Sequence, residues 1–182
     1  MLRKFGILFA VLTALAGCMD TGEVQLGPDG RPLPRVYRMP SDNRVQYQML
    51  DSVNLLREAA GLGPVELNSE LTAAAATHSR DMHVQNRPWH FGSDGSSPLD
   101  RVARVGYPGV MLGENISETY ETELETLAAW MEDEGTRFVL LHPEATEMGF
   151  SWFQENNGKI WWTLIMGDPS EAPMLPTEEL QG

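Results

Sequence analysis

Three side chains in one stretch of the sequence belong to types that bind metal ions or transfer protons. His78 and His90 precede Glu114, which stands in the run Gly113-Glu114-Asn115. Imidazole and carboxylate groups ligate zinc, and both exchange protons near neutral pH. The glycine favours a tight backbone turn. The sequence therefore predicts an acid held in a turn, which either accepts backbone N–H bonds or faces a pocket beside His90.

The two histidines are predicted to lie in different surroundings. His78 falls in a helical pattern that Asn68 would cap, with Glu70 in the first turn. The apolar face that includes His78 is formed by Leu71, Ala74, Ala75 and Met82. His78 is therefore expected to be a hydrogen-bonded residue of the core. His90 follows Pro88-Trp89 and precedes two glycines, which is typical of a loop, and loop histidines are better placed for chemistry.

Several further motifs follow one another in a specific order between residues 45 and 167. They are the helix 43–60 with 61–65, His78-Ser79, His90 with 94–97 and Arg101, Gly106-Tyr107, 113–116, Trp130-Met131, 148–150 and Trp161-Trp162. Together they resemble the CAP superfamily (cysteine-rich secretory proteins, antigen 5, pathogenesis-related 1), also called the SCP domain, in its bacterial form. The resemblance implies an α+β fold, an α-β-α sandwich in which helices flank an antiparallel sheet.

The resemblance also implies a cleft that, in many members, holds two histidines and two glutamates. His90 matches the first histidine and Glu114 the first glutamate. The second glutamate position is Asp133, and the second histidine position is Thr136, whose hydroxyl is a poor zinc ligand. His142 lies outside the pattern and would have to reach the cleft by another path. We expect no catalytic residue, no resident cofactor and at most weak zinc binding by His90 and Glu114.

The N-terminus carries the pattern of an export signal. Arg3 and Lys4 precede an apolar run, residues 5–16, that is too short to span a bilayer. Residues 15–18, Leu-Ala-Gly-Cys, resemble the lipobox of bacterial lipoproteins, in which the cysteine is lipidated. Cys18 is the only cysteine of the chain, so an internal disulfide is excluded. An ordinary signal peptide with a chance cysteine is the alternative.

These signals predict four segments: a signal peptide (1–17), a lipidated Cys18 with a tether (18–41), a CAP domain (42–168) and a disordered acidic tail (169–182). The expected location is the bacterial cell envelope, and Met19 after the cysteine favours the outer membrane. Loss of Arg3 and Lys4 would change the net charge from −13 to −15. Such acidity argues against nucleic acid and against direct electrostatic binding to anionic lipid headgroups.

Local signals also predict individual elements. Ser41 or Asp42 would cap the first helix, and Thr122 with Glu125 forms a capping box for a helix at 122–134. The inner face of that helix is predicted to contain Leu124, Leu127, Ala128 and Met131. Strands are expected at 148–154 and 159–166, joined by an Asn-Gly turn.

The sequence leaves two classes of function open. One is a non-catalytic lipoprotein that binds a ligand or a protein partner at the envelope, and the other is a metal-dependent hydrolase of envelope material. The replacements at Asp133 and Thr136 favour the first.

Overall fold

The computed structural model describes residues 28, 30, 31, 37–40 and 43–169. The chain divides into two units, residues 1–35 and 36–182, and every helix and strand below belongs to the second. The predicted signal peptide, Cys18, most of the tether, the caps Ser41 and Asp42, and residues 170–182 of the predicted tail lie outside the described residues. Among the described helices, none is both long and apolar enough to span a membrane.

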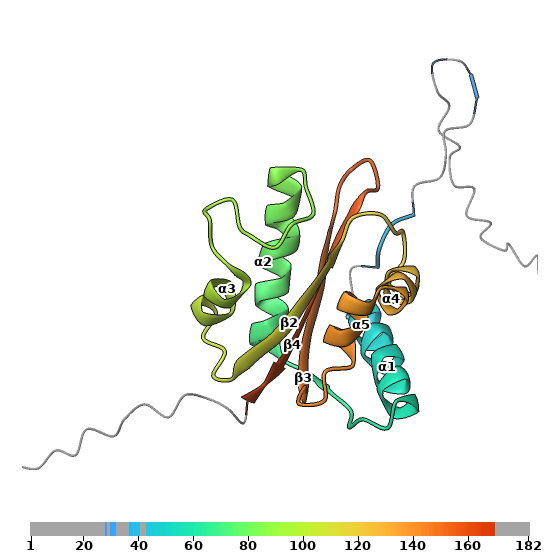
Figure 1. Cartoon of the computed structure of the whole chain (residues 1–182). Helices are drawn as coiled ribbons and strands as arrows, with labels where there is room; N and C mark the ends of the chain where they lie inside the picture. Colours follow the sequence, from blue (N-terminus) through green and yellow to red (C-terminus); the bar gives the residue numbers. More distant parts are fainter. Residues whose placement is uncertain (1–27, 29, 32–36, 41–42, 170–182) are drawn as a thin grey trace, which may run out of the picture. The chain divides into compact units, whose positions relative to one another are not determined.

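A four-stranded sheet forms the centre of the domain (Figure 1). Its strand order is β1 (Glu66–Leu67), β3 (Glu147–Gln154), β4 (Ile160–Asp168), β2 (Val110–Ser117). The pairs β3–β4 and β4–β2 are antiparallel, whereas the two-residue β1 runs parallel to β3. The predicted hairpin is present, and Gly158 in its turn has φ +100°, a conformation that favours glycine. Both predicted strands are confirmed.

One face of the sheet is covered by α2 (Ser69–Gln85), with α3 (Pro98–Arg104) beyond it (Figure 1). The predicted cap of α2 is confirmed, since the Asn68 side chain accepts from the Leu71 N–H at 2.9 Å. A Cβ on Gly149 of β3 would collide with the backbone of Leu71, so this glycine permits the close packing of α2 on the sheet. The buried apolar residues on this side include Leu71, Ala74, Ala75, Val102, Tyr107 and Ile165.

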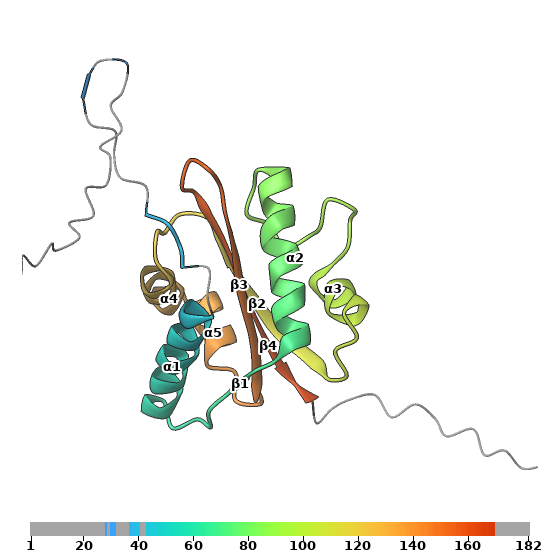
Figure 2. The same ribbon diagram turned by 180° about the vertical axis from the view of Figure 1, so that it is seen from behind.

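The other face is covered by α1 (Arg44–Ala59), α4 (Glu123–Glu132) and α5 (Glu134–Leu140), as the view from behind also shows (Figure 2). On α1, Val45, Met49 and Val53 are buried. Asn43 is the N-cap, and its side chain makes no capping bond. The domain is thus the α+β sandwich that the sequence predicts.

The capping box of Thr122 and Glu125 is confirmed. Of the predicted inner face of α4, Leu127 and Met131 do pack against the core, but the prediction is wrong for the other two residues. Leu124 is 51% exposed and Ala128 is exposed, whereas Leu127 and Trp130 are buried. The helix is rotated so that the Trp130 indole reaches the Ile116 carbonyl at 3.2 Å. It also ends at Glu132, two residues before the predicted end, because Asp133 caps α5.

Candidate functional site

Glu114 lies in the middle of β2, opposite Ile165 of β4, and not in the turn that the sequence predicts. Gly113 is therefore not needed for a positive φ. A Cβ at this position would lie 2.8 Å from a methyl carbon of Val139, so the glycine leaves room for α5 against the strand. The register of β2 against β4 shifts between Met111 and Gly113 and is continuous from Gly113 to Ser117. This paired stretch fixes the direction of the Glu114 side chain, because neighbouring strand residues point to opposite faces.

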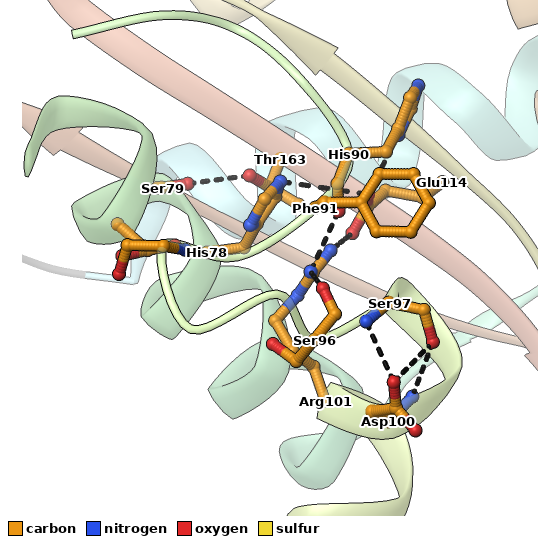
Figure 3. A network of polar contacts seen from close by, with 12 residues as sticks. His78, Ser79, His90, Phe91, Ser96, Ser97, Asp100, Arg101, Glu114 and Thr163 are labelled. Carbon is orange, nitrogen blue, oxygen red and sulfur yellow. Dashed lines mark hydrogen bonds and ion pairs between the residues drawn. The ribbon is translucent and has the colours of Figure 1, made fainter. Parts of the chain in front are cut away.

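Both carboxylate oxygens of Glu114 have partners (Figure 3). Oε1 lies 2.9 Å from His90 Nδ1, and Oε2 lies 2.7 Å from Arg101 Nη2. The Glu114 side chain is only 2% exposed. An ionised carboxylate can only accept, so His90 donates to Glu114 through Nδ1, and in the neutral tautomer that this contact favours the lone pair is on Nε2. In Figure 3 the outer nitrogen of the His90 ring points away from this network.

Arg101 connects the carboxylate to the loop that carries His90. Its Nη1 donates to the His90 carbonyl at 2.8 Å, while Nη2 reaches Glu114. The side chain is buried, and it projects from a helix whose start is fixed by the capping box of Ser97 and Asp100. The guanidinium therefore fixes the backbone of the loop at His90 and balances the negative charge of Glu114. Sequence analysis included Arg101 only as part of a motif and missed this role.

His78 is fully buried beside the same carboxylate, with Nε2 3.8 Å from Glu114 Oε1. The prediction that it is a core residue is confirmed. Within the described residues neither ring nitrogen makes a short, well-aligned hydrogen bond. Burial lowers the pKa of His78, and the Glu114 carboxylate and the Trp89 backbone, which acts as a hydrogen-bond partner does, oppose this shift in part. His78 is therefore a neutral imidazole packed behind the site at neutral pH.

A groove of about 570 Å³ opens on the outer side of this network. Its walls are the loop 88–91, the segment 116–120 at the end of β2, and the α4–α5 corner with Ala129, Trp130, Asp133 and Thr136. The His90 side chain is 51% exposed, and Trp89, Phe91 and Tyr120 expose their rings. The buried network thus positions one wall of a groove rich in aromatic side chains.

The sequence model of the cysteine-rich secretory protein family, CAP, matches residues 50–166. The chain belongs to the CAP family. YkwD of Bacillus subtilis is 30% identical over 122 residues, which are 67% of this chain and 47% of YkwD. The membrane protein YlbC of the same organism is 29% identical over 120 residues, 64% of this chain and 35% of YlbC. The chain therefore spans less than half the length of these two relatives.

Solved structures share the fold. An outer surface protein of Borrelia burgdorferi superposes with a TM-score of 0.64 at 13% identity, over 70% of this chain and 95% of that one. An extracellular SCP-domain protein of Bacillus anthracis superposes with a TM-score of 0.60 at 21% identity, over 72% and 45% of the two chains.

Asp133 and Thr136, the other two residues that the resemblance assigns to the cleft, line the same groove as His90, and both bond within the α4–α5 corner. Asp133 Oδ1 accepts the Thr136 N–H at 3.0 Å and so caps α5. The Thr136 hydroxyl donates to the Trp130 carbonyl at 2.7 Å. His142 lies just beyond α5, where its ring meets Phe138 edge-on. Asp133 and Thr136 thus stabilise the turn between α4 and α5.

The donor set at the CAP cleft does not fit a zinc ion. Zinc requires three or more strong ligands with free lone pairs, but Glu114 is held by Arg101 and His90, and Thr136 supplies only a hydroxyl. A guanidinium beside the carboxylate also repels a second cation. Among the residues that the structure describes, no cluster of three or more His, Cys, Asp or Glu side chains is arranged to hold a metal ion.

Proposed function

We propose that this chain is a lipid-anchored CAP-domain protein of the bacterial envelope that binds a ligand or partner in its groove without metal catalysis. The observation that carries this proposal is the pair between Arg101 and Glu114, 2.7 Å apart and buried. It neutralises the carboxylate that a metal centre would need and uses it to hold the His90 loop in place.

The groove supports a binding role through its exposed side chains. Trp89, Phe91 and Tyr120 present aromatic surface to solvent around the polar edge of His90. Exposed aromatic side chains gathered in a concave site, with a few polar groups, are typical of ligand recognition. The hydroxyls of Ser117, Thr119 and Tyr120 add hydrogen-bonding capacity along the same groove.

Metal content tests the non-metal part of the proposal. The purified chain is dialysed against zinc and titrated by calorimetry, together with Glu114→Gln. Weak binding that is equal in both proteins is expected. Tight binding of one zinc ion that Glu114→Gln abolishes would instead favour the metal-dependent hydrolase.

The oriented His90 imidazole is the one observation that favours a hydrolase, since a carboxylate on Nδ1 and an exposed Nε2 resemble a general base. Incubation of the chain with isolated cell-wall material, followed by analysis of released fragments, tests this alternative. We expect no release above that of His90→Gln. Release by the wild-type chain alone would establish catalysis.

Co-sedimentation with the same cell-wall material tests binding. Trp89→Ala, in the groove, should lower the bound fraction, whereas Leu99→Ala, an equally apolar change at an exposed residue of α3, should not. An equal loss in both variants would contradict a role for the groove.

The anchor rests on Cys18 and the apolar run before it. Several acyl chains on one cysteine would give stable membrane attachment. Metabolic labelling with a clickable fatty acid should label the wild-type chain and leave Cys18→Ala unlabelled. Equal labelling of the two proteins would refute the anchor.

A further inference from the structure

The segment 37–40, which precedes α1, is fixed to the tip of the β3–β4 hairpin. Arg38 donates to the carbonyls of Glu155 and Asn156 at 3.1 and 2.7 Å. The Gln154 amide donates to the Tyr37 carbonyl at 2.8 Å and accepts from the Met39 N–H at 3.0 Å. Whatever is attached upstream of residue 37 therefore joins the domain at the hairpin end of the sheet.

The same end of the domain carries cations stacked on aromatic rings. Arg80 lies over Phe153 at 5.7 Å, Arg87 over Trp89 at 3.7 Å, and Lys159 over Trp161 at 3.8 Å. The C-terminal end of α2 and the hairpin lie on the same side of the domain in both views (Figures 1 and 2). We call Arg38, Arg80, Arg87 and Lys159, with these rings, the hairpin-end surface.

Acidic residues near this surface are engaged in internal bonds. Asp81 accepts from the Ser93 hydroxyl at 2.6 Å, and Glu155 accepts from the Trp161 indole at 2.8 Å. Glu118 pairs at 2.5 Å with Lys159 of the surface itself, so the cations that remain to bind phosphate are Arg38, Arg80 and Arg87. By contrast, residues 92–152 contain twelve acidic residues and only three basic ones. The net charge of the chain therefore conceals an uneven distribution.

We propose that the hairpin-end surface faces the membrane and binds the phosphates of anionic lipid headgroups, an inference that rests on the proposed lipid anchor at Cys18. Tyr37 lies 19 residues after Cys18, so the hairpin cannot lie more than about 70 Å from the acyl chains even with that segment fully extended. Attachment at this end raises the effective concentration of the hairpin-end surface at the lipid.

The chemistry of the surface suits a headgroup layer. A guanidinium that stacks on a ring keeps its N–H donors in its own plane, where they can bind phosphate. Tryptophan and tyrosine side chains favour the membrane–water interface, and Trp89 and Tyr37 are both exposed. The net charge alone argues against binding to anionic headgroups. Within a Debye length of the lipid, however, the headgroups are attracted to the nearby cations of the hairpin-end surface.

The orientation of the anchored protein can be measured with single thiols. The full chain, processed in cells, is reconstituted in vesicles of phosphatidylglycerol and phosphatidylethanolamine. Asn156→Cys places a thiol at the exposed hairpin tip, and Glu144→Cys places one just before β3, at the opposite end of the sheet. A fluorophore on each thiol is then quenched by lipids that carry a spin label on the headgroup.

Stronger quenching at residue 156 than at residue 144 is expected. Each arginine should contribute a factor of roughly five to the docked population, so Arg80→Gln/Arg87→Gln should reduce that population about 25-fold. Arg104→Gln, which removes an exposed arginine of α3, is the matched control and should leave the difference unchanged.

Equal quenching at the two sites would overturn the proposal, as would a difference that persists in the double variant or in wholly phosphatidylcholine vesicles. These outcomes leave the anchor intact, provided that the chain floats with the vesicles. A chain that neither floats nor carries label from a fatty acid would refute the anchor, and the docking proposal with it.

Discussion

Two buried arginines, one on each face of the sheet, illustrate different uses of the same side chain. Arg57, on the side of α1 and α5, donates to the carbonyls of Gly63, Leu140, His142 and Ala145 at 2.8–3.0 Å. Arg101, on the side of α2 and α3, bonds a carboxylate and one loop carbonyl, and its Nε has no partner within the described residues.

The comparison shows what a buried charge does to its surroundings. Carbonyl groups stabilise the Arg57 cation through their dipoles. Arg57 therefore fixes backbone segments without forming an ion pair with a carboxylate of the described residues. Arg101 is neutralised by Glu114, so it also removes that carboxylate from metal chemistry at the groove. Burial lowers the pKa of Arg57, but a guanidinium remains charged in proteins.

The largest effect is expected for Arg57→Met. It leaves several buried carbonyls without a donor, and we expect the free energy of unfolding to fall by about 4 kcal/mol. Denaturant unfolding measures the change, with Arg137→Met as control, because Arg137 donates only to the Met131 and Glu132 carbonyls near the surface. A loss no greater than that of the control would show that these carbonyls are easily hydrated.

Arg101→Met should destabilise by about 3 kcal/mol, since it leaves Glu114 as a buried charge without its cation. Glu114→Ala should cost about 1–3 kcal/mol, because it removes the acceptor of two donors. In the double variant Arg101→Met/Glu114→Ala part of the loss should be recovered, and the double-mutant cycle with the two single variants measures that coupling. Strictly additive losses would mean that the pair is energetically independent despite its 2.7 Å contact.

Local signals predicted most of the fold, since caps such as Asn68 and Thr122 depend only on residues within one helical turn. Which face of α4 packs against the core was not predictable from such local signals. Leu127 fits two alternative faces, and the choice between them depends on Trp130 reaching Ile116 across the domain. Likewise, the pairing of Arg101 with Glu114 joins a helix to a strand, and neither sequence spacing nor residue type determines that contact.

His78 provides a pH-dependent test of the same network. Its pKa lies below the ordinary value of 6.5, chiefly through burial, although Glu114 and Asp81 oppose the shift and Arg101 adds to it. Below pH 6.5 the unfolded chain therefore binds a proton that the folded chain does not, and stability falls as pH decreases towards the folded pKa. The slope should reach at most about 1.4 kcal/mol per pH unit.

Urea unfolding between about pH 7.5 and 5.5 measures this slope, because histidine titrates in that range. His78→Gln should flatten the profile, whereas His142→Gln, which removes a histidine beyond α5, should leave it as in the wild type. A profile of equal slope in wild type and His78→Gln would show that another group controls the response.

The smallest effect is expected for Thr136→His, which places a histidine where the sequence resemblance predicts one, in the groove that His90 also lines. Because Arg101 continues to hold Glu114, the new imidazole gains only His90 as a strong partner, and zinc affinity should rise by less than about tenfold. Adding Arg101→Gln to Thr136→His should raise the affinity further, since it frees a carboxylate oxygen. Calorimetry on the wild type and both variants measures the series. If the single variant already bound zinc tightly, the Arg101–Glu114 pair would not be the element that distinguishes this groove from a metal centre. Tight zinc binding by the wild type that is lost in His142→Ala would instead show that His142 supplies the missing imidazole, in a conformation different from the one described above.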